Sequence, residues 1–168
     1  MKTIRIVTIT ILIKFLLIFT LHLLKLSNRI NMKKVLFLCT GNACRSQMAE
    51  GILRDLAGHR YQVFSAGTHP MRVHPASIKV MSEWGIDISH HSSDLLDDYI
   101  ESGMDTVITV CNSANRLCPI FPGDVERLHW PITDPFVNWS DENHFLEPYR
   151  KTRDLIKQRI EEFLEQRG

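Results

Sequence analysis

Strand-like and helical patterns alternate along most of this 168-residue sequence, and the alternation limits the folds that the chain can adopt. The strand patterns lie at 34–38, 61–65, 105–110 and 126–130, and the helical patterns lie at 46–58, 75–84, 94–101 and 144–165. Such alternation is typical of a parallel sheet whose connecting helices cover its faces. We therefore predict an α/β fold in which helices flank a four-stranded parallel sheet in a single domain.

The segment 35–46 contains a buried strand, a tight loop and the start of a helix. Its apolar run stops at Cys39, and Arg45 completes a C-x5-R pattern. Ser46 offers a cap for the helix that follows. Successive backbone N–H groups and the helix dipole make such a junction favourable for an anion. Arg45 adds a planar fork of donors that suits a tetrahedral oxyanion.

The same loop is predicted to hold a nucleophile. Gly41 and Asn42 tolerate the unusual backbone dihedral angles that a tight loop demands. The positive potential of the loop favours the thiolate of Cys39, which is the reactive form of a cysteine. A cysteine at a strand end is more often a small buried residue, and C-x5-R alone is a weak motif. The strand before it and the helix after it favour the nucleophile.

Residues 39–50, Cys-Thr-Gly-Asn-Ala-Cys-Arg-Ser-Gln-Met-Ala-Glu, resemble the active-site loop of the arsenate reductases built on the low-molecular-weight protein tyrosine phosphatase fold. The resemblance runs from about Met32 to the C-terminus and implies the strand order 2-1-3-4. Gln47 stands where phosphatases of this fold usually carry a proline, which favours the reductases. The resemblance also implies that the oxyanion is bound by Thr40, Gly41, Asn42, Ala43, Cys44, Arg45 and Ser46.

Two further cysteines, Cys111 and Cys118, follow the strand pattern at 105–110. The carboxyl ends of parallel strands lie on one edge of a sheet, so Cys111 is expected to reach the crevice of Cys39. If 111–118 were helical, the two α-carbons would lie ~10 Å apart, more than the ~7 Å that a disulfide tolerates. A Cys111–Cys118 bond therefore requires this segment to unwind.

The resemblance to thioredoxin-coupled arsenate reductases implies a relay among these thiols. Cys39 attacks arsenic, Cys111 then attacks Cys39 and releases arsenite, and Cys118 attacks Cys111 to leave a disulfide that thioredoxin reduces. Inert cysteines and a zinc site are the alternatives, although the C-x4-C and C-x6-C spacings are unusual for zinc. Cys44 has no part in the relay and is interpreted as a packed loop residue.

Asp134 and Pro135 follow the last strand pattern. By resemblance, Asp134 is the general acid that protonates the leaving hydroxyl group. A simple Asp-Pro turn is the alternative. Few aromatic residues flank Asp134 in the sequence, and this argues against a pocket that stacks on a phosphotyrosine ring.

Arsenate reductases of this branch often carry a monovalent cation beside the active loop. No other cofactor is implied. From the residues alone, capping and loop hydrogen bonds are the simpler interpretation of the matching positions. These positions bear oxygen atoms, as a potassium site requires, and they are Asn42, Glu50, Ser65 and Asp94.

Composition excludes some classes of partner. Twenty Lys and Arg residues against nineteen Asp and Glu residues give a formal net charge of +1, so no nucleic acid or other polyanion is implied. Four cysteines in a chain with catalytic thiols fit a reducing cytoplasm better than an extracellular disulfide framework.

Residues 1–31 form an apolar extension ahead of the predicted domain at 32–168. Its segment 6–24 is nearly long enough to span a bilayer, but Lys14 near the middle is costly there. No alanine precedes Ala43, so a typical signal-peptidase site is absent from the sequence. A start codon placed upstream and an uncleaved membrane anchor both stay open, and in either case the domain is expected to face the cytoplasm.

Three functions are therefore compared. The leading one is reduction of arsenate with thioredoxin as the reductant. The second is a low-molecular-weight phosphatase that acts on phosphate monoesters. The third is a non-catalytic oxyanion-binding protein or thiol redox sensor.

Overall fold

The structure is a computed structural model that describes residue 18 and residues 32–167. The predicted extension at 1–31, with the apolar segment 6–24, otherwise lies outside the described residues. No helix within the described part of the chain is long and apolar enough to cross a membrane.

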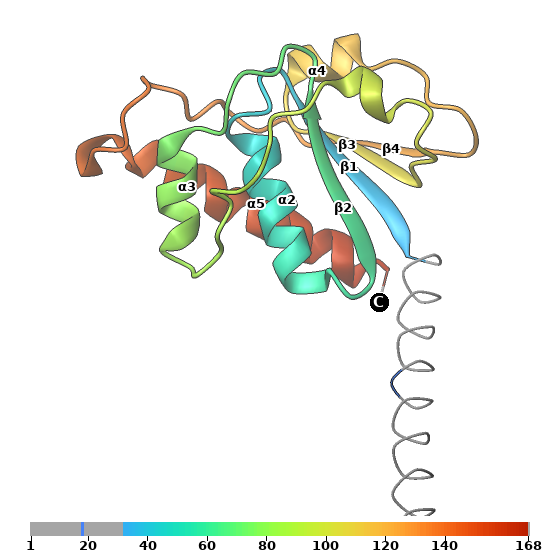
Figure 1. Ribbon diagram of the computed structural model, residues 1–168, viewed down its shortest axis with the longest axis horizontal. Coiled ribbons are helices and arrows are strands. Elements are labelled where there is room, and N and C mark those ends of the chain that lie inside the picture. Colours follow the sequence, from blue (N-terminus) through green and yellow to red (C-terminus); the bar gives the residue numbers. More distant parts are fainter. Residues whose placement is uncertain (1–17, 19–31, 168) are drawn as a thin grey trace, which may run out of the picture. The chain divides into compact units, whose positions relative to one another are not determined.

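A four-stranded parallel sheet with the strand order β2-β1-β3-β4 forms the centre of the fold (Figure 1). Every pairing between neighbouring strands is parallel. This confirms the predicted fold class and the order 2-1-3-4. The strands are β1 (Lys33–Cys39), β2 (Tyr61–Gly67), β3 (Thr106–Thr109) and β4 (Glu126–His129).

Helices connect and cover these strands. In Figure 1, α2, α3 and α5 lie together on the left of the sheet, whereas α4 contacts β1 and β3. The helices are α2 (Arg45–Ala57), α3 (Pro75–Ser82), α4 (Asn112–Leu117) and α5 (Glu147–Glu165), with 3-10 turns η1 (Leu96–Tyr99) and η2 (Asn143–Phe145).

The predicted helices differ from the observed ones mainly at their ends. The segment 94–101 forms only the short 3-10 turn η1. The last helix begins at Glu147 and not at 144, because Pro148 in its first turn suits a helix start and 143–145 forms η2.

The core lies between the sheet and α2 and α5. The side chains of β1 from Val35 to Leu38 are completely buried, as is typical of a central parallel strand. Ile156 and Ile160 of α5 are equally buried, so one face of that helix is apolar and packs into the core. Each such side chain contributes about 1.5–3 kcal/mol of hydrophobic stabilisation.

The sheet register brings the loops after β1 and β3 to one edge. Leu38 of β1 pairs with Thr109 of β3, so Cys39, one residue after Leu38, and Cys111, two residues after Thr109, both lie at this edge. The loop after β4 begins beside them, since His129 pairs with Thr109.

Candidate active site

Cys39 ends β1 and lies at the bottom of the predicted loop, where it is 2% exposed. Its Sγ accepts a hydrogen bond of 3.1 Å from the backbone N–H of Asn42 and lies 3.0 Å from Ser46 Oγ. Ser46 Oγ itself accepts from Asn42 Nδ2 at 2.9 Å, so its own hydrogen is free to point to the sulfur. Both groups can therefore donate hydrogen bonds to the Cys39 sulfur.

The prediction that Ser46 caps the helix is wrong. The helix α2 begins one residue earlier, at Arg45, so Ser46 lies within its first turn. This position aims the hydroxyl group back at Cys39 instead of at the orphan backbone N–H groups of the helix. Ser46 therefore forms a hydrogen bond with the Cys39 thiol and does not cap the helix.

The unusual loop conformation falls on Asn42, as predicted, but not on Gly41. Asn42 has a φ of +44° and is the only non-glycine residue in the left-handed region within the described chain, and Gly41 is not in that region. The glycine that the loop requires is Gly67 at the end of β2. A Cβ atom there would lie 2.7 Å from the Thr40 carbonyl oxygen, which is too close for any side chain.

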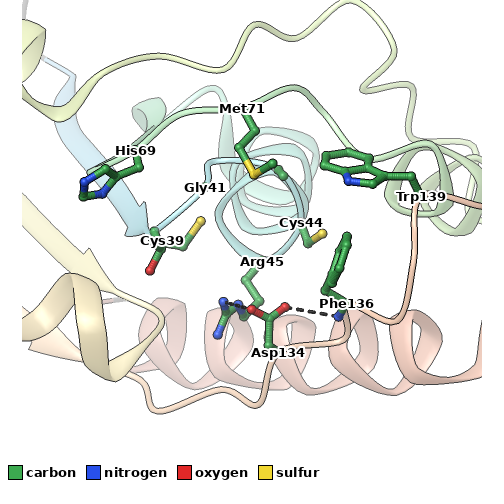
Figure 2. A pocket seen from close by; sticks show the side chains of 11 residues that line it. Cys39, Gly41, Cys44, Arg45, His69, Met71, Asp134, Phe136 and Trp139 are labelled. Atoms are coloured by element: carbon green, nitrogen blue, oxygen red, sulfur yellow. Dashed lines mark hydrogen bonds and ion pairs between the residues drawn. The ribbon is translucent and has the colours of Figure 1, made fainter.

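Arg45 lies at the centre of the site and is 8% exposed. Its Nη1 donates to the Ile132 carbonyl at 3.0 Å, and its Nη2 donates to Asp134 Oδ2 at 2.5 Å (Figure 2). Within the described residues, Nε of Arg45 is one of two buried side-chain polar atoms without a hydrogen-bond partner. A buried donor left unpaired is costly, so this nitrogen is suited to an oxyanion in the loop.

Asp134 enters the site from the loop after β4. Its Oδ1 accepts the backbone N–H of Phe136 at 3.1 Å, and its side chain is about half exposed. Figure 2 shows the carboxyl group next to the Arg45 guanidinium. Because Nε of Arg45 has no partner among the described residues, an oxyanion in the loop can bind it without breaking this ion pair.

A cavity of about 320 Å³ opens above Cys39. Figure 2 shows Cys39 at one end of it, Phe136 and Trp139 together at the other, and Met71 next to Gly41 between them. The expectation that aromatic residues are scarce around Asp134 is therefore wrong. The remaining residues that line the cavity are Thr40, Gly41, Ala43, Cys44, Arg45, His69 and Asp134.

A second, more polar cavity of about 340 Å³ adjoins the first and contains Cys111. The two cavities share Thr40, Arg45 and Asp134. Cys111 Sγ lies 3.4 Å from Thr40 Oγ1, so the second thiol sits against the residue that follows Cys39. It also accepts the Ala114 N–H at 3.3 Å and thereby caps α4.

Cys118 follows the last residue of α4, so the helix separates it from Cys111. The four cysteines, which all lie in the described part of the chain, are free thiols. Burial raises the pKa of the half-buried Cys118, and the nearby Arg127 opposes this. As expected from the sequence, a bond between Cys111 and Cys118 requires α4 to unwind.

Cys44 is buried on the wall of the first cavity. Burial raises its pKa to about 12, so it stays a neutral thiol at physiological pH. This agrees with its interpretation as a packed loop residue without a part in the relay.

The four residues of the predicted potassium site lie together behind the loop. Ser65 Oγ accepts from Asn42 Nδ2 at 2.8 Å and donates to Glu50 Oε2 at 2.6 Å. The Asp94 N–H donates to Asn42 Oδ1 at 2.8 Å. Burial raises the pKa of Glu50, and the negative charge of Asp94 adds to this effect, whereas Ser65 and Arg54 oppose it.

Sequence reasoning missed a brace that fixes Asn42 in its unusual conformation. The buried Gln47 donates through Nε2 to both Asn42 O and Asn42 Oδ1 at 3.1 Å. Gln47 Oε1 accepts from His91 Nδ1 at 2.9 Å, while His91 Nε2 accepts from Arg54 Nη1 at 3.0 Å. These contacts require a neutral imidazole, and burial together with Arg54 and His90 lowers the pKa of His91 to about 4.

The neutral state of His91 predicts a loss of stability in acid. Between pH 6.5 and about 4, the unfolded chain takes up a proton at His91 that the folded chain does not, so the free energy of unfolding falls as the pH falls. Above this range the ring is neutral in both states, and below it the ring is charged in both. We expect a contribution on the order of 2 kcal/mol after solvent screening.

Urea denaturation at pH 7.5, 5.5 and 4.5 would measure this contribution. His91→Asn keeps a donor near Nδ1 but does not titrate, so its stability should depend less on pH than that of the native chain. Equal pH dependence in the two proteins would contradict the assignment.

A second unpredicted histidine fixes the loop that carries Asp134. His74 is completely buried; its Nδ1 accepts the Ala76 N–H at 3.1 Å, and its Nε2 donates to the Asn138 carbonyl at 2.7 Å. The ring stacks between Trp139 and Tyr149, with centroid distances of 4.7 and 5.0 Å. No pattern in the sequence indicates that His74 contacts Trp139 and Tyr149, which are far from it along the chain.

Residues 34–167 match the low molecular weight phosphotyrosine protein phosphatase family. The chain belongs to this family. Arsenate reductase 1 of Staphylococcus epidermidis is 44% identical over 132 residues, which cover 78% of this chain and 95% of that protein. A solved arsenate reductase in the phosphate binding state has 34% identity and a TM-score of 0.65, and the match covers 80% of this chain and 98% of that one.

A thioredoxin-dependent arsenate reductase of Corynebacterium glutamicum is also similar to this chain. It has 32% identity and a TM-score of 0.64, and the match covers 80% of this chain and 61% of that one. The family and its reductase members therefore confirm the resemblance that the loop sequence indicated.

Proposed function

We propose that this chain is an arsenate reductase that works by a cysteine relay and is regenerated by thioredoxin. The observation that carries the proposal is the second thiol, Cys111, which lies against Thr40 at the edge of the oxyanion loop. A phosphatase has no use for a thiol there, whereas a reductase needs one to receive the oxidising equivalent. We assign the activity to residues 32–168 and place it in the cytoplasm, which keeps thiols reduced.

The first step binds and attacks arsenate. Loop N–H groups and the unpartnered Nε of Arg45 donate to the oxyanion and stabilise the charge that develops on its oxygens. The Cys39 thiolate attacks arsenic and forms a sulfur–arsenic bond. One oxygen leaves as water after receiving a proton from Asp134.

The second step reduces arsenic. The Cys111 thiolate attacks Cys39 Sγ, the electron pair of the sulfur–arsenic bond passes to arsenic, and arsenite leaves. Cys118 then attacks Cys111, so that Cys39 departs as a thiolate and a Cys111–Cys118 disulfide remains. Thioredoxin supplies the two electrons that return this disulfide to two thiols.

The structure of α4 favours the movement that the relay requires. The helix has only six residues, and Cys111 Sγ supplies its N-terminal cap. Attack on Cys39 turns this sulfur away from Ala114, and the loss of a cap typically costs a helix about 1 kcal/mol. Oxidation of Cys111 therefore weakens the helix that must unwind to bring Cys118 to it.

The decisive experiment measures arsenate-dependent oxidation of NADPH in the presence of thioredoxin and thioredoxin reductase. Hydrolysis of a chromogenic phosphate ester is measured in parallel on the same protein. We expect continuous arsenite production that stops when thioredoxin is omitted. Ester hydrolysis without any arsenite production would refute the proposal.

A second candidate function is hydrolysis of aryl phosphate monoesters. The specific observation in its favour is the aromatic end of the first cavity, formed by Phe136 and Trp139. Cys39, Arg45 and Asp134 are the residues that such hydrolysis would use. A non-catalytic oxyanion or redox sensor has less support, because it would not need this nucleophile and acid together.

We also propose that a potassium ion binds behind the loop. Glu50, Ser65, Asp94 and the Asn42 amide offer oxygen ligands, and the carboxyl groups of Asp94 and of Glu50, which is also paired with Arg54, supply negative charge. A bound cation would add positive charge there and fix Asn42. Because this would stabilise the fold, we expect potassium to raise the melting temperature by a few degrees relative to the same concentration of tetramethylammonium.

The variant Ser65→Ala should lose most of this potassium-dependent increase. Ser140→Ala, in the loop that carries Asp134, serves as the control and should retain it. If potassium and tetramethylammonium give the same melting temperature for the native protein, the cation site is refuted.

A further inference from the structure

The first cavity has an apolar end that arsenate does not use. Arsenate is polar on every side, and its partners are the loop N–H groups and Arg45. Met71, Phe136 and Trp139 nevertheless line the same cavity, and Met71 and Phe136 are 62% and 47% exposed. Apolar surface exposed beside a cluster of polar groups is typical of a site that binds an organic group.

The aromatic wall is already formed and does not need to assemble around a ligand. Trp139 stacks on His74 with an interplanar angle of 19°, and the Arg72 guanidinium covers its ring at 4.6 Å. Phe136 meets Trp139 nearly edge-on at 5.6 Å and meets His74 at a right angle. This packing leaves an edge of Trp139 and the ring of Phe136 toward the cavity, as Figure 2 shows.

The apolar end and the second thiol lie on different sides of the site. Cys111 lines the polar cavity, whereas Met71, Phe136 and Trp139 line only the first one. Arg45 and Asp134 lie between the two cavities and belong to both. A group that fills the apolar end therefore leaves the approach of Cys111 to Cys39 open.

We propose that the site also accepts arsonates in which an aromatic group replaces one oxygen of arsenate, and that it reduces them. This inference rests on the proposed relay and extends its range of substrates. One of the three remaining oxygens faces Asp134, the other two bind the loop N–H groups and Arg45, and the aromatic group lies between Phe136 and Met71.

The reaction keeps the carbon–arsenic bond. The Cys39 thiolate attacks arsenic, the bond from arsenic to one hydroxyl oxygen breaks, and that oxygen leaves as water after receiving a proton from Asp134. Cys111 attacks Cys39 Sγ, and the electron pair of the sulfur–arsenic bond reduces As(V) to As(III). The arylarsonous acid leaves, and thioredoxin returns the two electrons by the same route as for arsenate.

Steady-state turnover of phenylarsonate, methylarsonate and arsenate tests the proposal, with thioredoxin, thioredoxin reductase and NADPH present. For the native protein, we expect kcat/KM for phenylarsonate to exceed that for methylarsonate by about tenfold, because the ring contacts Phe136. Phe136→Ala should remove most of this preference, so that its kcat/KM for phenylarsonate falls by about tenfold relative to its kcat/KM for arsenate.

Val137→Ala is the matched control, since Val137 is the next residue of the same loop and is 51% exposed but does not line the cavity. It should keep the preference for phenylarsonate. Phenylphosphonate, which the relay cannot reduce, should inhibit arsenate reduction more strongly than methylphosphonate.

The outcomes separate this inference from the proposed function. Failure to reduce arsenate would refute the relay itself. Turnover of arsenate without turnover of phenylarsonate would overturn only the present inference, even if phenylphosphonate inhibits. Equal losses for arsenate and phenylarsonate in Phe136→Ala would overturn the role of the apolar end.

Discussion

The variant Cys118→Ser is expected to convert only one molecule of arsenate to arsenite per protein molecule. Cys39 and Cys111 remain, so the variant should still bind arsenate, form the sulfur–arsenic bond and release one arsenite. It should then stop as a Cys39–Cys111 disulfide, because the thiol that frees Cys39 is missing. Rapid-quench measurement should therefore show a burst of about one arsenite per protein molecule and no steady-state rate.

The trapped disulfide gives a second, independent measurement. Peptide mass analysis after the burst should find Cys39 joined to Cys111, and a strong chemical reductant should restore one further turnover. Leu117→Ser is the matched control, since Leu117 is the neighbouring residue of α4 and is 58% exposed. It should keep multiple turnovers, and multiple turnovers of Cys118→Ser with thioredoxin would refute the relay.

Much of the fold could be predicted because its central strands are buried on both faces. The segment at 34–38 is mostly apolar, and the segment at 105–110 is rich in β-branched residues. Both patterns are typical of central strands in a parallel sheet. Their positions in the structure differ from the prediction by only a residue at each end. The strand order, by contrast, came from family resemblance, since periodicity carries no information about which strands pair.

The helix α4 shows where local sequence reasoning ends. Asn112, Ser113 and Asn115 are weak helix formers, so the sequence left the segment 111–118 undecided. In the structure, the cap from Cys111 Sγ and contacts with β1 and β3 stabilise it. A helix that depends on these contacts is also one that a change at Cys111 can release.

The sequence predicted the residues of the oxyanion loop better than it predicted the residues that surround the loop. Cys39, Asn42 and Arg45 are neighbours in sequence, so one motif could indicate their shared role. The brace from Gln47 to His91 and the packing of Trp139 on His74 join residues that are far apart along the chain. Such contacts depend on the tertiary fold, and no pattern in a single sequence reports them.

Arg45 should be the most sensitive position after the thiols. It donates to Ile132 and Asp134 while its buried Nε stays available, so one side chain both orders the acid loop and binds the oxyanion. Lysine keeps the charge but offers a single ammonium group, which cannot make these contacts at once. We expect Arg45→Lys to lower kcat/KM for arsenate by about 10²–10³-fold.

The control for this prediction is Arg150→Lys. Arg150 lies on α5, forms an ion pair with Glu83 and does not line either cavity. This variant should change kcat/KM for arsenate by less than about twofold, because an exposed ion pair contributes little. The melting temperature of each variant separates a loss of function from a loss of folding. If a folded Arg45→Lys retained native kcat/KM, positive charge alone would suffice at this position, and the fork geometry assigned to Arg45 would be wrong.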